Sequence, residues 1–251
     1  MEQYLKKITK QGKALFLAYD QGLEHGPKDL IGSSIDPNFI LDLADKGGAT
    51  GVILQGGIAE QYYRASSFSQ VPLILKINGK SNLYQSEDPY SPITWDINDA
   101  KKIGASAIGY TIFLGSAYEY KMFKDFSELR NKAHAMGLAM IAWVYPRGKF
   151  IQDEDSEEIT AYAARVGLEL GADMVKIKYS GSEENFKKAV LAAGKTKVVL
   201  SGGSKISEED FYQVIENVMQ AGAIGAAVGR NIWQSEKPLE VMNRITKIIW
   251  K

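Results

Sequence analysis

Short apolar runs alternate with longer amphipathic stretches along the whole chain. Eight such runs occur, and each ends in glycine, polar or charged residues: 14–20, 50–55, 72–78, 105–113, 138–145, 173–179, 197–203 and 223–230. Near-continuous apolar character is typical of parallel strands that are buried on both faces. The pattern therefore predicts eight buried parallel strands.

Helix signals lie between most of these runs. Asp36 is a cap residue followed by Pro37 at the first helical position, and residues 156–170 repeat apolar side chains at helical spacing. Ser207 opens a weak capping box. Several amphipathic stretches end in a glycine that can form the left-handed cap of a helix, namely Gly104, Gly171 and Gly222.

Strands and helices thus alternate without a linker or a shift in composition. The length of 251 residues suits one α/β barrel. We predict a single (β/α)8 barrel over residues 1–251, with a short N-terminal helical extension. A doubly wound open sheet is the competing architecture, but eight regular repeats favour closure. In a barrel, the residues at the carboxyl ends of the strands gather in one mouth.

Composition excludes several classes of function. Lys+Arg and Asp+Glu both total 30, so the chain lacks the net positive charge of a nucleic-acid-binding protein. No apolar run is long enough for a membrane span, and the N-terminus has no apolar signal segment. The chain has no cysteine, which excludes disulfides and thiolate chemistry and suits a cytoplasmic location.

Two strand ends predict a phosphate site. Ser201, Gly202 and Gly203 follow the seventh run, and Gly229 and Arg230 follow the eighth. Paired glycines allow backbone N–H groups to approach a phosphate, and an arginine can grip its oxygens with a planar fork. Barrels commonly bind phosphate at these two loops. Tight turns alone would explain either glycine motif, but not as readily both together.

The two histidines do not indicate a metal site. His25 lies in the loop after the first run, and His134 lies in a helical pattern where we expect a surface position. One histidine with scattered carboxylates is a poor zinc signature, so we expect no metal and no other cofactor.

The sixth run contains two lysines with the spacing of one strand face, Lys176 and Lys178. Burial and mutual repulsion would both lower a lysine pKa and create a nucleophile for a ketone. A structural lysine that is paired with a carboxylate across the barrel, or one that snorkels near the rim, explains the same pattern. Spacing does not choose between the two, and Lys76 at the end of the third run is a further, weaker candidate.

Three alternating residues end the fifth run. Trp143, Tyr145 and Arg147 share one face, so that Tyr145 could transfer a proton and Arg147 could hold a second anion. An aromatic barrel layer followed by an ordinary turn is the competing interpretation. Asp20 ends the first run, where it would orient a catalytic partner or neutralise Lys176.

Eight segments at the strand ends resemble the archaeal-type class I fructose-bisphosphate aldolases of the DhnA/DeoC-like aldolase family. They are LAYDQGLEHGP (17–27), LQGGIAEQYY (54–63), LILKINGK (73–80), GASAIGYTIFLGS (104–116), AWVYPRG (142–148), GADMVKIKYSG (171–181), SGGSK (201–205) and AVGRNIWQ (227–234). The resemblance implies a TIM barrel that cleaves fructose 1,6-bisphosphate through a Schiff base, in glycolysis and gluconeogenesis. It also implies a homo-oligomer built from pentamers, up to a decamer.

The resemblance assigns roles to individual residues. It implies that Lys176 is the Schiff-base lysine, Tyr145 the proton donor and Asp20 the acidic residue that assists carbinolamine chemistry. The phosphate nearest the ketone would contact Ser201, Gly202, Gly203, Gly229 and Arg230. The far phosphate would contact Arg147, with help from His25. Trp143 and Lys178 complete the expected substrate site.

One position departs from the family pattern. Many members have histidine directly after the first-strand aspartate, where this chain has Gln21, which cannot titrate near neutrality. If that position transfers a proton, the role is lost or is taken by His25, whereas a hydrogen-bonding role suits Gln21. A related branch makes an aminodeoxyheptulosonate by a transaldolase-like exchange with the same lysine, tyrosine and aspartate. A phosphosugar isomerase without a Schiff base and a phosphosugar sensor are more distant alternatives.

Overall fold

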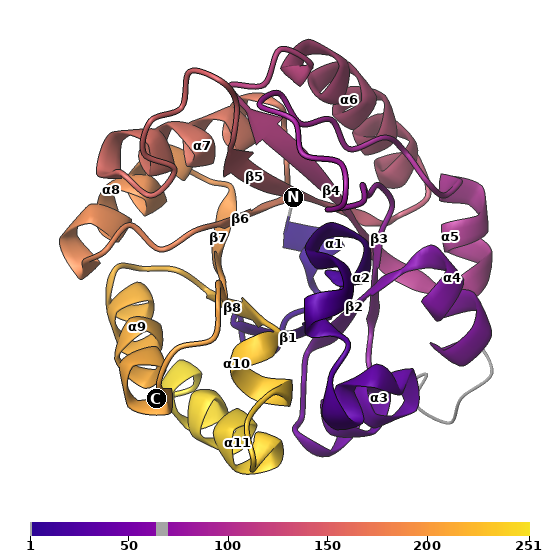
Figure 1. The fold of residues 1–251 in the computed structure, drawn as a ribbon, viewed down its shortest axis with the longest axis vertical. Coiled ribbons are helices and arrows are strands. Elements are labelled where there is room, and N and C mark those ends of the chain that lie inside the picture. Colours follow the sequence, from indigo (N-terminus) through magenta and orange to yellow (C-terminus); the bar gives the residue numbers. More distant parts are fainter. Residues whose placement is uncertain (1, 64–69) are drawn as a thin grey trace.

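Eight parallel strands form a closed barrel in chain order, from β1 round to β8 (Figure 1). The computed structural model describes residues 2–63 and 70–251. The predicted (β/α)8 barrel is confirmed, and the open sheet is wrong because β1 pairs with β8. The strands are β1 (Ala14–Tyr19), β2 (Gly51–Gln55), β3 (Leu73–Lys76), β4 (Ala105–Leu114), β5 (Ala139–Pro146), β6 (Met174–Ile177), β7 (Lys197–Ser201) and β8 (Gly225–Val228).

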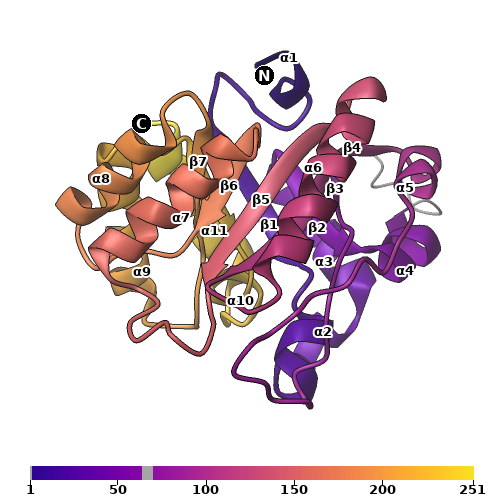
Figure 2. The ribbon, with the colours of Figure 1, turned by 90° about the horizontal axis from the view of Figure 1, so that it is seen from above.

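Helices surround the barrel, and short helical turns lie at its two ends (Figures 1 and 2). The outer ring consists of α3 (Pro37–Lys46), α5 (Ile97–Ile103), α6 (Glu119–Ala135), α7 (Glu157–Glu169), α8 (Glu183–Ala193), α9 (Glu208–Gln220) and α11 (Pro238–Ile249). The shorter elements are α1 (Glu2–Leu5), α2 (Gly22–His25), η1 (Gly26–Asp29), η2 (Gly32–Ile35), α4 (Gly56–Ile58), the π-helical η3 (Ala59–Tyr63) and α10 (Arg230–Trp233). None of the helices in the described ranges combines the length and apolar composition that a membrane crossing needs.

The helix ends follow the predicted local chemistry. The Asp36 side chain accepts a hydrogen bond from the Asn38 backbone N–H at the start of α3, where Pro37 occupies the first position. Ser207 caps α9 in the same way. Gly104, which follows α5, has a positive φ of 95° and so ends the helix in the left-handed conformation. The signals read from the sequence therefore act at the expected positions.

Side chains alternate between two apolar layers along each strand. One set points into the barrel and includes Phe16, Ile53, Ile74 and Trp143, while the other packs between the sheet and the helices. Both sets are buried, which explains the continuous apolar runs. The barrel interior is therefore a packed core below the mouth.

The amino-terminal segment covers one end of the barrel (Figure 2). Leu5 and Ile8 are buried in the same cluster as Ala14 and Phe16, so their side chains close this end of the barrel. In Figure 2, α2 and α10 lie at the opposite end. The mouth is therefore the end at which the strands finish.

The loops that follow β1 and β3 differ in structure. Residues 21–35 form α2, η1 and η2, and the Tyr19 hydroxyl donates to the Ser34 carbonyl at 2.5 Å. Residues 79–95 contain no helix or strand and have one isolated bridge, between Asn78 and Ile93. Both loops follow strand ends, so both border the mouth.

Candidate active site

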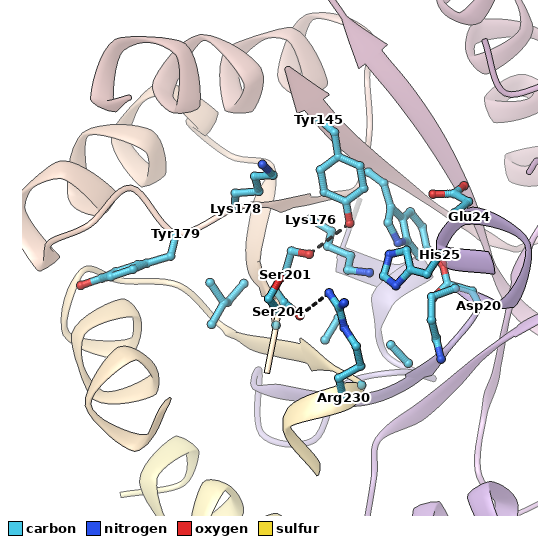
Figure 3. A pocket seen from close by; sticks show the side chains of 18 of the residues that line it. Asp20, Glu24, His25, Tyr145, Lys176, Lys178, Tyr179, Ser201, Ser204 and Arg230 are labelled. Carbon is cyan, nitrogen blue, oxygen red and sulfur yellow. Dashed lines mark hydrogen bonds between the residues drawn. The ribbon is translucent and has the colours of Figure 1, made fainter. Parts of the chain in front are cut away.

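A cavity of about 430 Å³ opens at the carboxyl end of the barrel. Apart from Lys76, the cavity brings together the site residues put forward from the sequence: Asp20, Gln21, His25, Trp143, Tyr145, Arg147, Lys176, Lys178, Ser201, Gly202, Gly203, Gly229 and Arg230. Figure 3 shows several of these side chains around the cavity. Residues that are far apart in the sequence meet here because their strands end in the same mouth.

Lys176 lies in the floor of this cavity. It belongs to β6 and is only 6% exposed. Its ammonium group lies 5.1 Å from the centre of the Trp143 ring, on the neighbouring strand β5. The indole therefore forms an apolar wall beside the amine, and Figure 3 shows the amine pointing into the cavity.

The pKa of Lys176 does not follow the prediction from spacing. Burial lowers this pKa, but Tyr145 and then Asp20 raise it, and the net direction is upward. The predicted repulsion by Lys178 is wrong because the Lys178 ammonium is paired with Glu154 at 2.6 Å. The groups around Lys176 therefore oppose the effect of burial, and the amine must be neutral when it attacks a carbonyl.

Tyr145 stands near the end of β5 and reaches towards β7. Its hydroxyl lies 3.1 Å from the hydroxyl of Ser201, and either oxygen can be the donor (Figure 3). Tyr145 also has the largest pKa-raising effect on Lys176. A phenol placed between an amine and a second hydroxyl has the surroundings of a proton-transfer group.

Arg230 begins α10 and is held by two partners. Its Nη2 donates to the Gly203 carbonyl at 2.8 Å, and its Nη1 lies 3.9 Å from Asp29. The same Asp29 oxygen is 2.7 Å from Nδ1 of His25. Burial lowers the pKa of His25, opposed by its hydrogen bond to Asp29. The structure thus ties His25 to Arg230 through a buried carboxylate.

The loop after β7 is shaped by close backbone approach. The Gly202 N–H donates to the Ala227 carbonyl at 2.9 Å, so this amide is already bonded within the barrel. A Cβ at Gly202 would lie 3.0 Å from the Val228 α-carbon, and Gly203 has a positive φ of 66°. Asn231 donates to the carbonyls of Gly202 and Ser204 at 2.7 and 2.9 Å. These glycines therefore form a fixed turn that faces Arg230.

Arg147 and Lys178 lie at another part of the rim. Nζ of Lys178 is 2.6 Å from Oε2 of Glu154 and 3.0 Å from Asp155, and Nε of Arg147 is 3.4 Å from the same Glu154 oxygen. Arg147 also lies over the ring of Tyr145 at 5.8 Å. Arg147 and Lys178 are thus linked through Glu154, whereas His25 and Arg230 are linked through Asp29.

Sequence reasoning missed several charged partners. Glu24 lines the cavity and pairs at 2.9 Å with Lys76, which is fully buried. Asp29, Glu154 and Asp155 were also missed, and their partners become apparent only when the loops are folded. The pairing of Lys76 argues against its role as the nucleophile, in favour of Lys176.

His134 departs from its expected surface position. It lies in α6 as predicted, but its Nε2 is 2.8 Å from Asp173 and its ring stacks on Tyr4 with 4.1 Å between the centroids.

Across residues 2–63 and 70–251, no group of three or more His, Asp or Glu side chains has a geometry that could hold a metal ion.

The barrel and its mouth define the class of protein. A buried lysine on the sixth strand faces a tyrosine and an aspartate, beside an arginine and a glycine turn at the seventh and eighth strands. The family model of the DeoC/LacD family aldolases matches residues 14–235. The chain therefore belongs to the DeoC/LacD aldolase family.

Comparison with individual relatives assigns the chain to a group within this family. The chain is 46% identical to the class 1 fructose-bisphosphate aldolase of Thermoproteus tenax, over 99% of this chain and 94% of that protein. It is 41% identical to the enzyme of the same name from Halobacterium salinarum, over 97% and 93%. A solved archaeal fructose-1,6-bisphosphate aldolase, with its catalytic lysine bound to a carbinolamine intermediate, matches with a TM-score of 0.95 at 45% identity, over 100% and 99%. Within the family, the chain thus falls in the archaeal class I fructose-bisphosphate aldolase group.

Proposed function

We propose that this protein reversibly cleaves fructose 1,6-bisphosphate to dihydroxyacetone phosphate and glyceraldehyde 3-phosphate as a class I aldolase. The observation that carries the proposal is the position of Lys176, buried in the mouth between Trp143, Tyr145 and Asp20. A Schiff base formed by a lysine replaces the metal ion as the electron sink, so the proposal requires no metal cofactor.

The reaction begins at the C2 ketone of the open-chain sugar. Lys176 loses its proton and attacks C2, and loss of water from the carbinolamine gives an iminium. The C3–C4 bond breaks as the C4 hydroxyl loses its proton, and the bonding electrons enter the iminium to form an enamine. Glyceraldehyde 3-phosphate leaves, C3 is protonated, and hydrolysis frees dihydroxyacetone phosphate and the amine.

The other side chains have separate roles in these steps. Tyr145 delivers the proton to C3, and Asp20 assists the formation and breakdown of the carbinolamine. Arg230 and the turn at Ser201, Gly202 and Gly203 hold the phosphate on C1. Fixing both ends of a flexible substrate orients C2 towards the amine, and orientation of this kind can lower a barrier by ~7 kcal/mol or more.

The far phosphate, on C6, is assigned to the other cationic pair. Arg147 and Lys178 converge on one carboxylate oxygen, which shows that both side chains can reach a single anion. His25, by contrast, is bonded to Asp29 beside Arg230. We therefore assign His25 to the C1 end of the substrate, in place of the far end expected from the resemblance.

Borohydride reduction with peptide mapping tests the proposal. Fructose 1,6-bisphosphate plus borohydride should give a stable adduct of dihydroxyacetone phosphate on Lys176, and Lys176→Met should show neither adduct nor cleavage. Lys178→Met is the matched control and should retain the adduct on Lys176. Cleavage that survives in Lys176→Met, or an adduct that maps to Lys178, would refute the assignment. Direct assay of fructose 1,6-bisphosphate also separates this activity from aminodeoxyheptulosonate synthesis.

A further inference from the structure

One oxygen of Glu154 serves both cations at the far end of the cavity. Oε2 of Glu154 lies 2.6 Å from Nζ of Lys178 and 3.4 Å from Nε of Arg147. Asp155 contacts Lys178 at 3.0 Å and does not share in the Arg147 contact. Glu154 is thus the carboxylate that links the two cationic side chains.

These residues come from two separate strand ends. Arg147 directly follows β5, Glu154 lies in the segment between β5 and α7, and Lys178 directly follows β6. Figure 3 shows the charged ends of Lys178 and Arg230 apart from each other, with the amine of Lys176 pointing into the cavity. Arg230 has its own partners, Gly203 and Asp29. The two cationic groups are therefore neutralised separately.

The Glu154 contacts are open to displacement. The side chains of Arg147, Lys178 and Glu154 are 41%, 24% and 38% exposed, and ion pairs that are this accessible to water are weak. A phosphate carries a charge of about −1.5 to −2 and three acceptor oxygens, whereas a carboxylate carries a single charge. A phosphate that approaches Arg147 and Lys178 can therefore compete with Glu154 for both.

We propose that Glu154 is a specificity-determining residue, an internal counter-ion that competes with the far phosphate of the sugar. This inference rests on the proposed aldolase function and on the assignment of the C6 phosphate to Arg147 and Lys178. Glu154 holds the two cations in the empty protein and gives way when the bisphosphate binds. It returns when glyceraldehyde 3-phosphate, the product that carries this phosphate, leaves. Its charge thus weakens the binding of substrates with a far phosphate and has no effect on sugars that lack one.

The test compares two substrates in Glu154→Gln, which keeps the shape of the side chain and removes its charge. For fructose 1,6-bisphosphate, we expect KM to fall by about fivefold, the size expected for one accessible ion pair. For fructose 1-phosphate, which has no far phosphate, KM should stay the same. Inhibition by glyceraldehyde 3-phosphate should become stronger in the variant. Glu154→Asp keeps the charge on a shorter side chain and should give intermediate values.

Glu158→Gln is the matched control. Glu158 is an exposed residue in the first turn of α7, and the same charge removal there should change neither KM. The inference is overturned if Glu154→Gln raises KM for the bisphosphate, or if the KM values for both sugars change together or not at all. Those results differ from failure of the proposed function, in which the unmodified protein would give neither cleavage nor a borohydride adduct.

Discussion

The indole of Trp143 occupies the space beside Gly109 that a larger residue would fill. A Cβ added at Gly109 would lie 1.8 Å from Cη2 of Trp143. Gly109 is in β4, and its backbone lies outside the left-handed region, so the constraint is one of space alone. The same indole forms the wall beside Lys176, with 5.1 Å between the ring centre and the ammonium nitrogen. The size of residue 109 therefore controls where this wall stands.

Gly109→Ala should damage both stability and activity. The added methyl must push the indole out of its position, and overpacking of this kind costs about 1–3 kcal/mol. Thermal unfolding should show a lower Tm, and kcat should fall because the wall beside the amine moves. Gly57→Ala is the control, since a Cβ there meets nothing within 4 Å. Unchanged kcat in Gly109→Ala would show that the indole does not position the amine.

Tyr145→Phe should separate Schiff-base formation from the later proton transfer. Loss of a positioned proton donor lowers rates by about 10²–10⁴-fold, so kcat should fall by this order while the borohydride adduct on Lys176 still forms. Ser201→Ala removes the hydroxyl that lies 3.1 Å from the phenol, in the turn assigned to the C1 phosphate, and we expect kcat to fall roughly fivefold, the size of one hydrogen bond. An adduct that disappears in Tyr145→Phe would place Tyr145 in the first step instead.

Asp20→Asn should move the pH dependence of Schiff-base formation towards lower pH. Only the neutral amine attacks, so the rate rises with pH as Lys176 loses its proton. Burial lowers the pKa of Lys176, and Tyr145 and Asp20 raise it to a net upward shift. Removing the Asp20 charge takes away one raising effect, so the pKa falls and the rising limb begins at lower pH. The maximum rate should also fall, because Asp20 assists the carbinolamine steps.

The profile is measured from the rate of borohydride trapping at a series of pH values. Asp45→Asn, on the exposed side of α3, removes the same charge far from the mouth and should leave the midpoint where it is. A midpoint that stays constant in Asp20→Asn, or moves to higher pH, would contradict the effect of Asp20 on the amine.

The barrel and the residues that line its mouth could be predicted from the sequence for one physical reason. A strand buried on both faces is a continuous apolar run, so its end is visible locally, and closure of the barrel then brings all the ends together. Lys176, Tyr145 and Arg230 could be placed in one cavity in this way. Spacing alone could not show whether Lys176 or Lys178 is the nucleophile, because both side chains lie on one face of the strand.

The electrostatic partners could not be predicted in the same way. Glu24 pairs with Lys76 across 52 positions, and Glu154 pairs with Lys178 across 24. Such contacts depend on how the loops fold over the mouth, and neither spacing nor periodicity encodes that path. The predicted direction of the Lys176 pKa shift was wrong for this reason, since the shift depends on which charges lie near the amine. The ion-pair partners could therefore be identified only from the structure.

The amino-terminal segment should contribute to stability without affecting catalysis. Ile8 is fully buried in the barrel interior. It follows α1, which lies at the end away from the mouth (Figure 2). Ile8→Ala leaves a cavity there, and truncations of this type cost about 2–5 kcal/mol. Thermal unfolding should therefore show a Tm several degrees lower, while kcat at a temperature where the variant is folded stays the same. Lys6→Ala, at an exposed position next to α1, is the control and should change neither. An unchanged Tm in Ile8→Ala would mean that this segment does not close the barrel in solution, and a lower kcat would mean that packing at one end governs geometry at the other.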